Sequence, residues 1–475
     1  MNHARAVRWS QDEFGDADIG DERRVRRLVQ MAAAGLVRPA GMVTEVFSTS
    51  SGREGAYRLL ENPEVVQSEL TAAAGRAAAR RCKSEKTVVV PMDGSSLNLR
   101  DPSRRRGLGP VGARASGAQG VLVMTSLAVD MKGATLGVLD QHYWTRSQGA
   151  SLKSQVRRRA KKKDRRPRDQ RESFLWVKCM RRVVGRMSVD ARETTAWFQL
   201  DRGADCMEVL MEAADAKLCV TVRAIHDRCV RWPNGTDGRL LTSMARRPVA
   251  GTYTVDVPAR PNQTERTATM ALRSARIPLE LKVGTKRRRV LEMDVVLATE
   301  QHAPHGQTPL RWLLFTTRPV ATVGDLRIVV SAYALRWRVE DFHKTWKSNA
   351  CNIEASKLGS KDAILRWATI MASVATRIEH IKHAARTTPD RPATELFTRD
   401  EIDATILLYS AGLTKIKVPY RPGDTPTVAE AVRWIASLGG HMGNTKTRPP
   451  GTKVLARGLA QVAAVARVLA AQRDA

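Results

Sequence analysis

The sequence lacks several features that would assign it to a common class of protein. No apolar run of about 18 residues occurs among its 475 residues, so no transmembrane helix is expected. The first residues, MNHARAVRWSQDEFGD, lack the apolar segment of a signal peptide, and the chain has no P-loop. The six cysteines form no CxxC pair and show no zinc-finger spacing. We therefore expect a cytoplasmic protein with reduced cysteines, no membrane contact and no nucleotide cofactor.

Acidic residues are scarce relative to basic ones. The chain has 79 lysines and arginines but only 48 aspartates and glutamates, which gives a formal net charge of +31. An excess of this size indicates a polyanionic partner, usually nucleic acid. A membrane surface is a weaker alternative, because no basic amphipathic helix with bulky apolar anchors is evident. A generically basic protein, such as a ribosome-associated factor, would carry the same excess.

The first 70 residues have the pattern of a small helical module. Asp21 can cap a helix in which four arginines are interspersed with apolar residues. A second helix would end at Asn62-Pro63, because a proline disfavours helical geometry at the residue before it. A basic helical domain over residues 1–70 suits DNA binding, and a solvated charged helix face is the plainer alternative.

The rest of the chain divides into two larger parts. Residues 71–385 mix β-rich and helical patterns, and three apolar runs after residue 86 predict a meander of three strands. Alternating apolar and polar residues predict a β-rich insertion at about 224–310. Residues 386–475 are largely helical. These patterns indicate an α/β core flanked by a helical domain at each end.

A dense basic run occupies residues 153–171, with eleven lysines and arginines. Like-charge blocks of this density are usually mobile. The run can contact phosphates nonspecifically or form a solvated loop, and both interpretations stay open.

Two aspartates stand where apolar β-rich runs end. The run at 87–92 stops at Asp93, and the run at 195–200 leads into Asp201. A carboxylate at a strand end can project into a cleft while the strand holds it rigid. Turn-forming or helix-capping aspartates are common at such places and are the plainer alternative.

A third acidic residue belongs to a more specific pattern. The segment from Tyr333 to Lys347 has the spacing Y-x2-R-x3-E-x6-K. On one long helix, expected over 325–347, Arg336 and Glu340 would share a face with these two residues. That face presents a carboxylate that can bind a metal, among two cations and a phenol that can hold phosphate oxygens. An ordinary surface pair of Arg336 and Glu340 is the plainer alternative.

This segment resembles the YREK signature of the insertion-sequence-four (IS-four) family of DDE transposases. The resemblance continues in the same order along nearly the whole chain. It covers residues 19–24 and 54–58 (the N-terminal DNA-binding domain), the context of Asp93, Asp201–Asp205 (the DREAD-type motif), Arg223, residues 308–314, and residues 434–442 (the C-terminal dimerisation domain). Gly203 departs from the motif, which has glutamate at this position.

The resemblance implies an RNase H-like catalytic core with the β-rich insertion, followed by a helical dimerisation domain. It implies that Asp93, Asp201 and Glu340 are catalytic and bind two Mg2+ or Mn2+ ions in each active site. It also implies DNA or phosphate contacts near the scissile bond, made by Tyr333, Arg336, Lys347, Arg223 and Trp312. Trp312 would stack on a flipped base, or else be a core tryptophan.

The activity implied by the resemblance is cut-and-paste transposition in a bacterial cytoplasm. A homodimer would join two transposon ends in a synaptic complex, cleave double-stranded DNA through a hairpin intermediate and transfer the 3′ ends to target DNA. Two rivals stay open, a catalytically inactive DNA-binding relative and a structure-specific nuclease of the same fold. A nucleic-acid packaging protein would explain the charge but not the three carboxylates.

Overall fold

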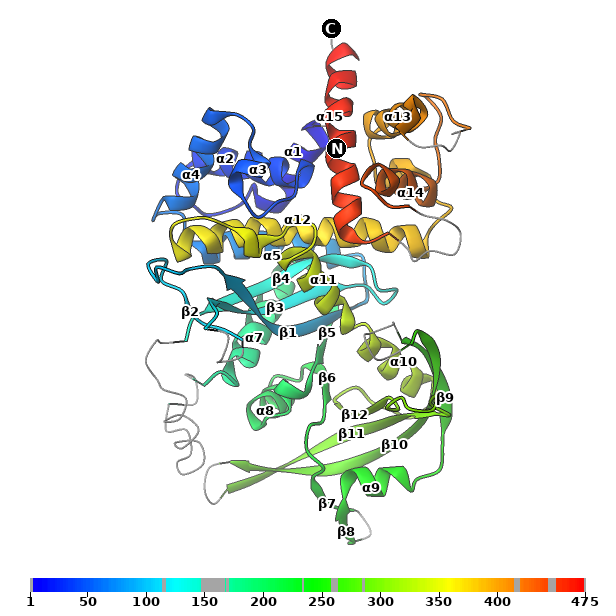
Figure 1. Cartoon of the computed structure of the whole chain (residues 1–475). Coiled ribbons are helices and arrows are strands. Elements are labelled where there is room, and N and C mark those ends of the chain that lie inside the picture. The colour runs from blue at the N-terminus through cyan, green and yellow to red at the C-terminus, as the bar shows by residue number, and fades with distance from the viewer. Residues whose placement is uncertain are drawn as a thin grey trace.

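The computed structural model describes residues 3–112, 117–146, 167, 171–232, 235–257, 264–283, 287–413, 419–442 and 450–473. Apart from Pro167 and Arg171, the basic run lies outside these residues. The described chain folds around one mixed ten-stranded sheet, with helices packed on both of its faces (Figure 1). The protein is therefore of mixed α/β class, as the sequence predicted.

One half of the sheet consists of five strands: β1 (Thr87–Leu99), β3 (Gln119–Val129), β4 (Thr135–Trp144), β5 (Thr195–Leu200) and β6 (Cys219–Arg223). β3 runs antiparallel to both of its neighbours, β1 and β4, which confirms the predicted meander. β5 lies parallel to β1, and β6 lies parallel to β5. The strand order is therefore β4-β3-β1-β5-β6, in which β1, β5 and β6 run in the same direction.

The other half of the sheet continues from β6 through four antiparallel strands: β12 (Arg311–Thr316), β11 (Arg287–Gln301), β10 (Arg266–Val283) and β9 (Gly251–Val257). The tenth strand, β2 (Gly109–Pro110), pairs with β3. A separate two-stranded sheet of β7 (Cys229–Arg231) and β8 (Asp237–Arg239) leads into α9 (Leu240–Ala245). Residues 224–310 are thus β-rich, and their long strands extend the main sheet instead of forming a second one.

Each face of the sheet has its own apolar core, because alternate residues of a strand point in opposite directions. Val89 of β1 belongs to the core beneath α12 (Lys361–Thr387), whereas Val88 and Val90 belong to the core beneath α7 (Phe174–Asp190). Two further helices flank the sheet: α5 (Gln67–Cys82) against β4, and α8 (Met207–Asp215) beside α7.

In the described residues, α5 is preceded by four helices: α1 (His3–Phe14), α2 (Glu22–Val37), α3 (Val43–Val46) and α4 (Ser50–Glu61). Asp21 caps α2, and α4 ends at Asn62, as the sequence predicted. Arg366, a buried residue of α12, donates hydrogen bonds to the carbonyl oxygens of Leu60 and Val65. These bonds fasten the end of the N-terminal helices to the longest helix of the protein.

Among the described residues, three α-helices follow α12: α13 (Arg399–Leu408), α14 (Val428–Leu438) and α15 (Thr452–Arg473). Among the described residues, one helix, over Thr452–Gln472, is long and apolar enough to cross a membrane by length and composition alone. Its sequence is not one unbroken apolar run, because Arg457 and Arg467 interrupt it. Core helices pass the same test, and Leu455 and Val462 of α15 are buried where it packs on α13 and α14.

The first apolar run of the sheet is longer than predicted. β1 does not stop at Asp93 but continues to Leu99. The reason is the partner strand, since β3 pairs with β1 along this whole stretch, from Met92↔Ser126 to Leu99↔Gln119.

The single helix predicted over 325–347 is also wrong. The structure has two helices there, α10 (Val323–Ala334) and α11 (Trp337–Lys347). They join at a tight turn in which the backbone N–H of Arg336 donates to the carbonyl oxygen of Tyr333, a 3₁₀-type bond. The backbone stays close to helical at this turn, so the residues of the signature still lie near one another.

Candidate active site

Three charged residues stand in one row across the parallel strands. Met92 of β1 pairs in register with Leu200 of β5, and Leu200 pairs with Val222 of β6. Each partner is followed directly by a charged residue, in turn Asp93, Asp201 and Arg223. Because the three strands run in the same direction, these residues occupy neighbouring positions at the same level of the sheet.

The carboxyl group of Asp93 is hard to ionise. Burial raises its pKa to about 7; the charge of Arg336 opposes this rise, and the charges of Asp201 and Glu340 add to it. The carboxylate also accepts a hydrogen bond of 3.0 Å from the backbone N–H of Gly94. The three predicted carboxylates therefore lie close enough for the charges of Asp201 and Glu340 to disfavour ionisation of Asp93.

Asp201 both accepts a backbone hydrogen bond and interacts with the carboxyl group of Asp93. Its Oδ1 accepts a hydrogen bond of 2.7 Å from the backbone N–H of Gly203, and so caps a short 3₁₀ helix at Arg202–Ala204. Its charge also acts on Asp93. The capping role that the sequence left open is therefore present, and it holds the carboxylate beside β1. The departure at Gly203 leaves this backbone donor unchanged.

Glu340 is engaged by an arginine of the same signature. Nη2 of Arg336 donates to Oε1 of Glu340 at 2.6 Å. The pair expected as the plainer alternative thus exists, but it is not an ordinary surface pair. Only 9% of the Arg336 side chain is exposed, and its charge acts on Asp93 as well.

Two hydrogen-bond donors beside these carboxylates are unused. The hydroxyl of Tyr333 and Nε of Arg336 are buried, and neither donates a well-formed hydrogen bond within the described parts of the chain. Arg336 and Arg223 lie close to the Tyr333 oxygen, but arginines can only donate to it, so the O–H of the phenol stays available. Burial raises the pKa of the Tyr333 phenol, while the nearby charges of Arg336 and Arg223 lower it. Leaving buried donors unpaired costs free energy, so the place is suited to an anionic ligand that accepts both.

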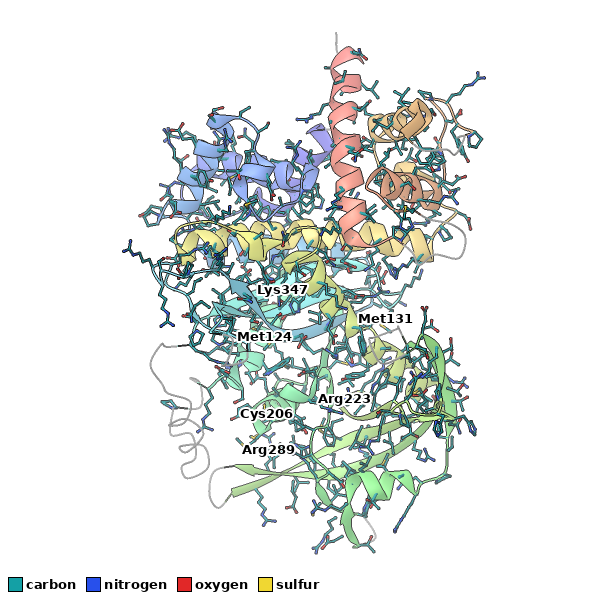
Figure 2. The ribbon with its side chains drawn as sticks, viewed as in Figure 1. Met124, Met131, Cys206, Arg223, Arg289 and Lys347 are labelled. Atoms are coloured by element: carbon teal, nitrogen blue, oxygen red, sulfur yellow. The ribbon has the colours of Figure 1, made fainter. Side chains whose placement is uncertain are left out.

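Lys347 reaches the strand of Asp93 from the far end of α11. Its Nζ donates to Oγ of Ser95 at 3.1 Å and lies 3.7 Å from a carboxylate oxygen of Glu354. Ser95 is two residues beyond Asp93 and therefore points to the same face of β1. Figure 2 shows Lys347 over the β1–β3 part of the sheet and Arg223 nearer to β12.

Arg223 lies in a local excess of positive charge. Burial lowers its pKa; the phenol of Tyr333 opposes this, and the charges of Arg202 and Arg336 lower the pKa further. Three arginines therefore surround the candidate site. Arg202 was not among the predicted site residues, and its position directly after Asp201 is the signal in the sequence that points to it.

Trp312 lies in the apolar core. It is only 3% exposed, and its ring meets that of Tyr333 edge-on, with 5.3 Å between the ring centroids. This is the position of a core tryptophan, the alternative weighed for this residue. The structure thus places Trp312 next to the signature tyrosine but covers its ring in this conformation.

A metal site is not assembled in this conformation. Among the described residues, no three histidines, cysteines, aspartates or glutamates form a group that could hold a metal ion. Asp93, Asp201 and Glu340 interact through their charges, but Glu340 is turned to Arg336. Metal binding by the three carboxylates stays a prediction.

The N-terminal helices present basic side chains to solvent. Arg23, Arg26 and Arg58 are exposed, and Tyr57 lies beside Arg58 on the exposed side of α4. Arg58 pairs with Glu54 one turn earlier on the same helix. Exposed arginines together with an exposed aromatic ring are typical of surfaces that contact nucleic acid.

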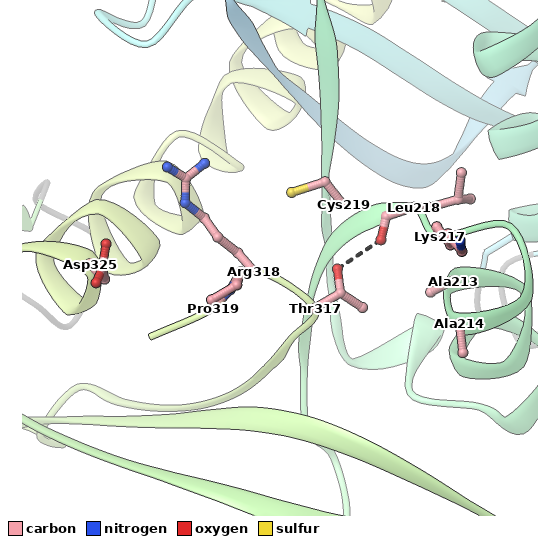
Figure 3. Close-up of a pocket in the computed structure, with 9 residues that line it drawn as sticks. All are labelled: Ala213, Ala214, Lys217, Leu218, Cys219, Thr317, Arg318, Pro319 and Asp325. Carbon is pink, nitrogen blue, oxygen red and sulfur yellow. Dashed lines mark hydrogen bonds between the residues drawn. The ribbon is translucent and has the colours of Figure 1, made fainter. Parts of the chain in front are cut away.

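A separate cavity of about 590 Å3 lies at the other end of β6 (Figure 3). It opens beside Cys219, where β6 begins, whereas Arg223 ends the strand at the candidate site. Two polar side chains of its lining serve the fold: Oγ1 of Thr317 donates to the carbonyl oxygen of Leu218, and Asp325 forms the capping box of α10 with Thr322, the N-cap residue. The cavity is therefore separate from the carboxylates.

Residues 6–65 match the family model of the transposase DNA-binding domain. The matched segment contains α2 and α4, with their exposed arginines, and ends at the residues that Arg366 fastens to α12. The N-terminal part of this chain is therefore similar to the DNA-binding domain of transposases, which supports a transposase that binds DNA.

Proposed function

We propose that this protein is a cut-and-paste DNA transposase of the DDE type, from the IS-four family and closest to the transposase of transposon five. One observation carries the proposal: Asp93 and Asp201 follow register partners on parallel strands, and Glu340 acts on the same carboxyl group. This acidic group stands in the same chain as a segment similar to transposase DNA-binding domains. A packaging protein has no need of such a group.

The strand arrangement supports an RNase H-like core. Three antiparallel strands followed by two parallel ones, in the order β4-β3-β1-β5-β6, agree with the fold that the signature implied. The β-rich residues 224–310 fall between the strand that ends at Arg223 and the helix of Glu340, which is where an insertion was expected.

The three carboxylates suit hard divalent cations, because carboxylate oxygens are the ligands that Mg2+ and Mn2+ prefer. Asp93, Asp201 and Glu340 would hold two such ions, and the repulsion that helps raise the pKa of Asp93 would be relieved by them. When bound, the ions would activate the attacking water or DNA 3′-OH and stabilise the leaving 3′ oxygen. Because Arg336 pairs with Glu340, this binding requires Glu340 to turn or to share its two oxygens.

The cationic side chains would position the DNA backbone. The unpaired donors of Tyr333 and Arg336 would bind oxygens of the phosphate next to the scissile bond. Arg223 and Lys347 would hold phosphates on either side. In phosphoryl transfer the protein contributes mainly positioning and neutralisation of charge, which this arrangement provides.

Trp312 would act at the hairpin step by stacking on a flipped base. Its ring is buried against Tyr333, so this role requires the ring to leave that contact. The residues in contact with Trp312 are thus the part of the site that we expect to move when DNA binds.

The remaining parts of the chain would organise the DNA ends. Residues 6–65 would read the end repeats, and the C-terminal helices would hold two copies together in a synaptic complex. The reaction would take place in the cytoplasm of a bacterium.

A second candidate function is a DNA-binding relative without cleavage activity. The pairing of Glu340 with Arg336, and the lack of a preformed metal group in the described residues, favour it. A single assay separates the two candidates.

The assay incubates purified protein with DNA that carries its own flanking end repeats, in Mg2+ and in Mn2+. We expect hairpin and joined products from the wild type and none from Glu340→Ala. Asp341→Ala is the matched control, because it removes a carboxylate from the same helix where that group only meets Lys344 at 3.7 Å. End binding without product in either metal would contradict the transposase and leave the DNA-binding relative.

A further inference from the structure

A chain of buried polar side chains lies beside the carboxylates. The hydroxyl of Tyr143 donates to Oε1 of Gln141 at 2.9 Å, and Nε2 of Gln141 donates to Oγ1 of Thr125 at 3.3 Å. His343 of α11 reaches the same threonine, with 3.1 Å between its Nε2 and Oγ1 of Thr125. Gln141, Thr125 and His343 are all buried. The chain therefore connects α11 with two strands of the sheet.

The two ends of the His343–Thr125 bond adjoin the proposed catalytic residues. Thr125 of β3 is the register partner of Asp93 of β1. His343 follows Glu340 by three residues, so the two side chains lie on the same face of α11. One hydrogen bond thus joins the helix that carries Glu340 to the strand pair that carries Asp93.

His343 is held in one orientation. Its ring packs against those of Phe342 and Trp346, with centroid distances of 5.6 Å and 6.3 Å, and these two rings also stack on each other. Burial lowers its pKa to about 3, and the charge of Lys347 acts in the same direction, so the imidazole is neutral at physiological pH. A neutral imidazole has one donor and one acceptor nitrogen, and the hydroxyl of Thr125 can pair with either form.

Adhesion of α11 to the sheet does not require this polar pair. Val339, Phe342 and Trp346 of the helix are buried in the apolar core, and these contacts attach the helix without fixing its position along its axis. A hydrogen bond tolerates only a narrow range of distance and angle. The polar pair therefore adds a defined position to an attachment that is otherwise apolar.

We propose that the His343–Thr125 hydrogen bond is a positioning device that sets the place of Glu340 relative to Asp93, and so the geometry in which both bind a divalent cation. The inference rests on the proposed function, because it assumes that these carboxylates bind metal. His343 and Thr125 touch neither metal nor DNA in this proposal; they act through Glu340 and Asp93.

The test measures the affinity of the full-length protein for Mn2+ without DNA, from the electron paramagnetic resonance signal of free Mn2+. Thr125→Val keeps the shape of the side chain and removes the hydroxyl, and we expect it to weaken Mn2+ binding roughly tenfold or more. Thr125→Ser restores the hydroxyl and should restore the affinity. Ser126→Ala is the matched control, because it removes a buried hydroxyl from the neighbouring residue, which points to the opposite face.

A second pair of measurements separates positioning from stability. End binding by Thr125→Val should equal that of the wild type, and its cleavage should need a higher Mg2+ concentration for half-maximal rate. His343→Gln combined with Thr125→Val should weaken Mn2+ binding no more than either change alone, since both remove the same bond.

Two results would overturn the inference. One leaves the proposed function intact, and the other contradicts the proposed function as well. If Thr125→Val lowers the unfolding midpoint but leaves Mn2+ affinity and the Mg2+ requirement as in the wild type, the bond is merely structural and the proposed function stands. If the wild type binds no Mn2+ and cleaves no DNA, the inference falls together with the proposed function. Should His343→Gln fail to fold, the Thr125 variants still decide between these results.

Discussion

Asp93 and Asp140 belong to the same sheet, yet their surroundings are opposite. Asp140, on β4, is 1% exposed and receives Arg182 and Arg186 of α7, each at 2.7 Å. Asp93 faces two other carboxylates and one arginine that already binds Glu340. Where a buried carboxylate holds helix to sheet, the fold surrounds it with matching positive charge. Where the charge is left unmatched, the geometry is suited to binding a ligand.

The same contrast, between a carboxylate paired with arginine and one without such a partner, occurs within the segment Asp201–Asp205. Asp205 accepts two hydrogen bonds from Arg228, at 2.6 Å and 2.8 Å, and a third from the backbone N–H of Ile225 at 2.8 Å. Asp201, four residues earlier, receives one backbone bond and acts on Asp93. The first aspartate of the motif is thus available to a ligand, and the second anchors the loop that follows Arg223.

The largest expected effect is on catalysis. Asp93→Asn removes a negative charge where charges repel, so we expect the rate of end cleavage to fall about a thousandfold or more, because metal contacts supply several kcal/mol of transition-state stabilisation. The free energy of unfolding without metal should not fall at pH 8, since the repulsion is relieved. Cleavage assays and urea unfolding measure the two effects. A variant that cleaves at nearly the wild-type rate would contradict the role of Asp93.

The opposite pattern is expected for Asp140→Asn. The substitution leaves Arg182 and Arg186 without their counter-charge in a buried place, so we expect the free energy of unfolding to fall by about 3 kcal/mol. Urea unfolding measures this loss. Cleavage per folded molecule, assayed well below the unfolding midpoint, should stay at the wild-type rate. A loss of cleavage without a loss of stability would show that Asp140 belongs to the functional group instead.

The pH dependence of stability should reveal Asp93. Burial raises its pKa in the folded protein to about 7, whereas an aspartate in the unfolded chain has a pKa of about 3.9. The folded state therefore binds the extra proton, and its contribution to stability is complete below pH 4 and is lost as the pH rises to 7. We expect the metal-free wild type to lose stability over this window relative to Asp93→Asn, measured by urea unfolding at several pH values. Parallel curves for the two proteins would contradict the raised pKa.

Local patterns predicted much of the fold but not its register. The caps at Asp21 and Asn62 and the apolar runs around Asp201 depend on neighbouring residues, so they could be read directly. The continuation of β1 beyond Asp93 could not, because Asp-Gly-Ser-Ser has the composition of a turn and only pairing with β3 makes it a strand. The interruption between α10 and α11 at Arg336 likewise could not be predicted, because no proline or glycine marks it in the sequence.

The sequence predicted which residues form the candidate site, but its local patterns did not predict how the fold brings them together. The spacing of Tyr333, Arg336 and Glu340 groups them on one helix face, and their contacts agree with this. That Asp201 lies beside Asp93 depends on the pairing of β5 with β1, which no local pattern contains. Residues that act through tertiary contacts, such as His343, were missed for the same reason.

The smallest expected effect belongs to an exposed carboxylate. Asp237 of β8 pairs with Arg231 at 3.0 Å, but their side chains are 66% and 70% exposed. Water solvates both charges, so their attraction is nearly balanced by the cost of holding the side chains together. We expect Asp237→Asn to leave the midpoint of urea unfolding and the cleavage rate at their wild-type values, with any small shift vanishing at high salt. A marked loss of stability would mean that pairing with arginine, and not burial, distinguishes Asp140 from Asp93.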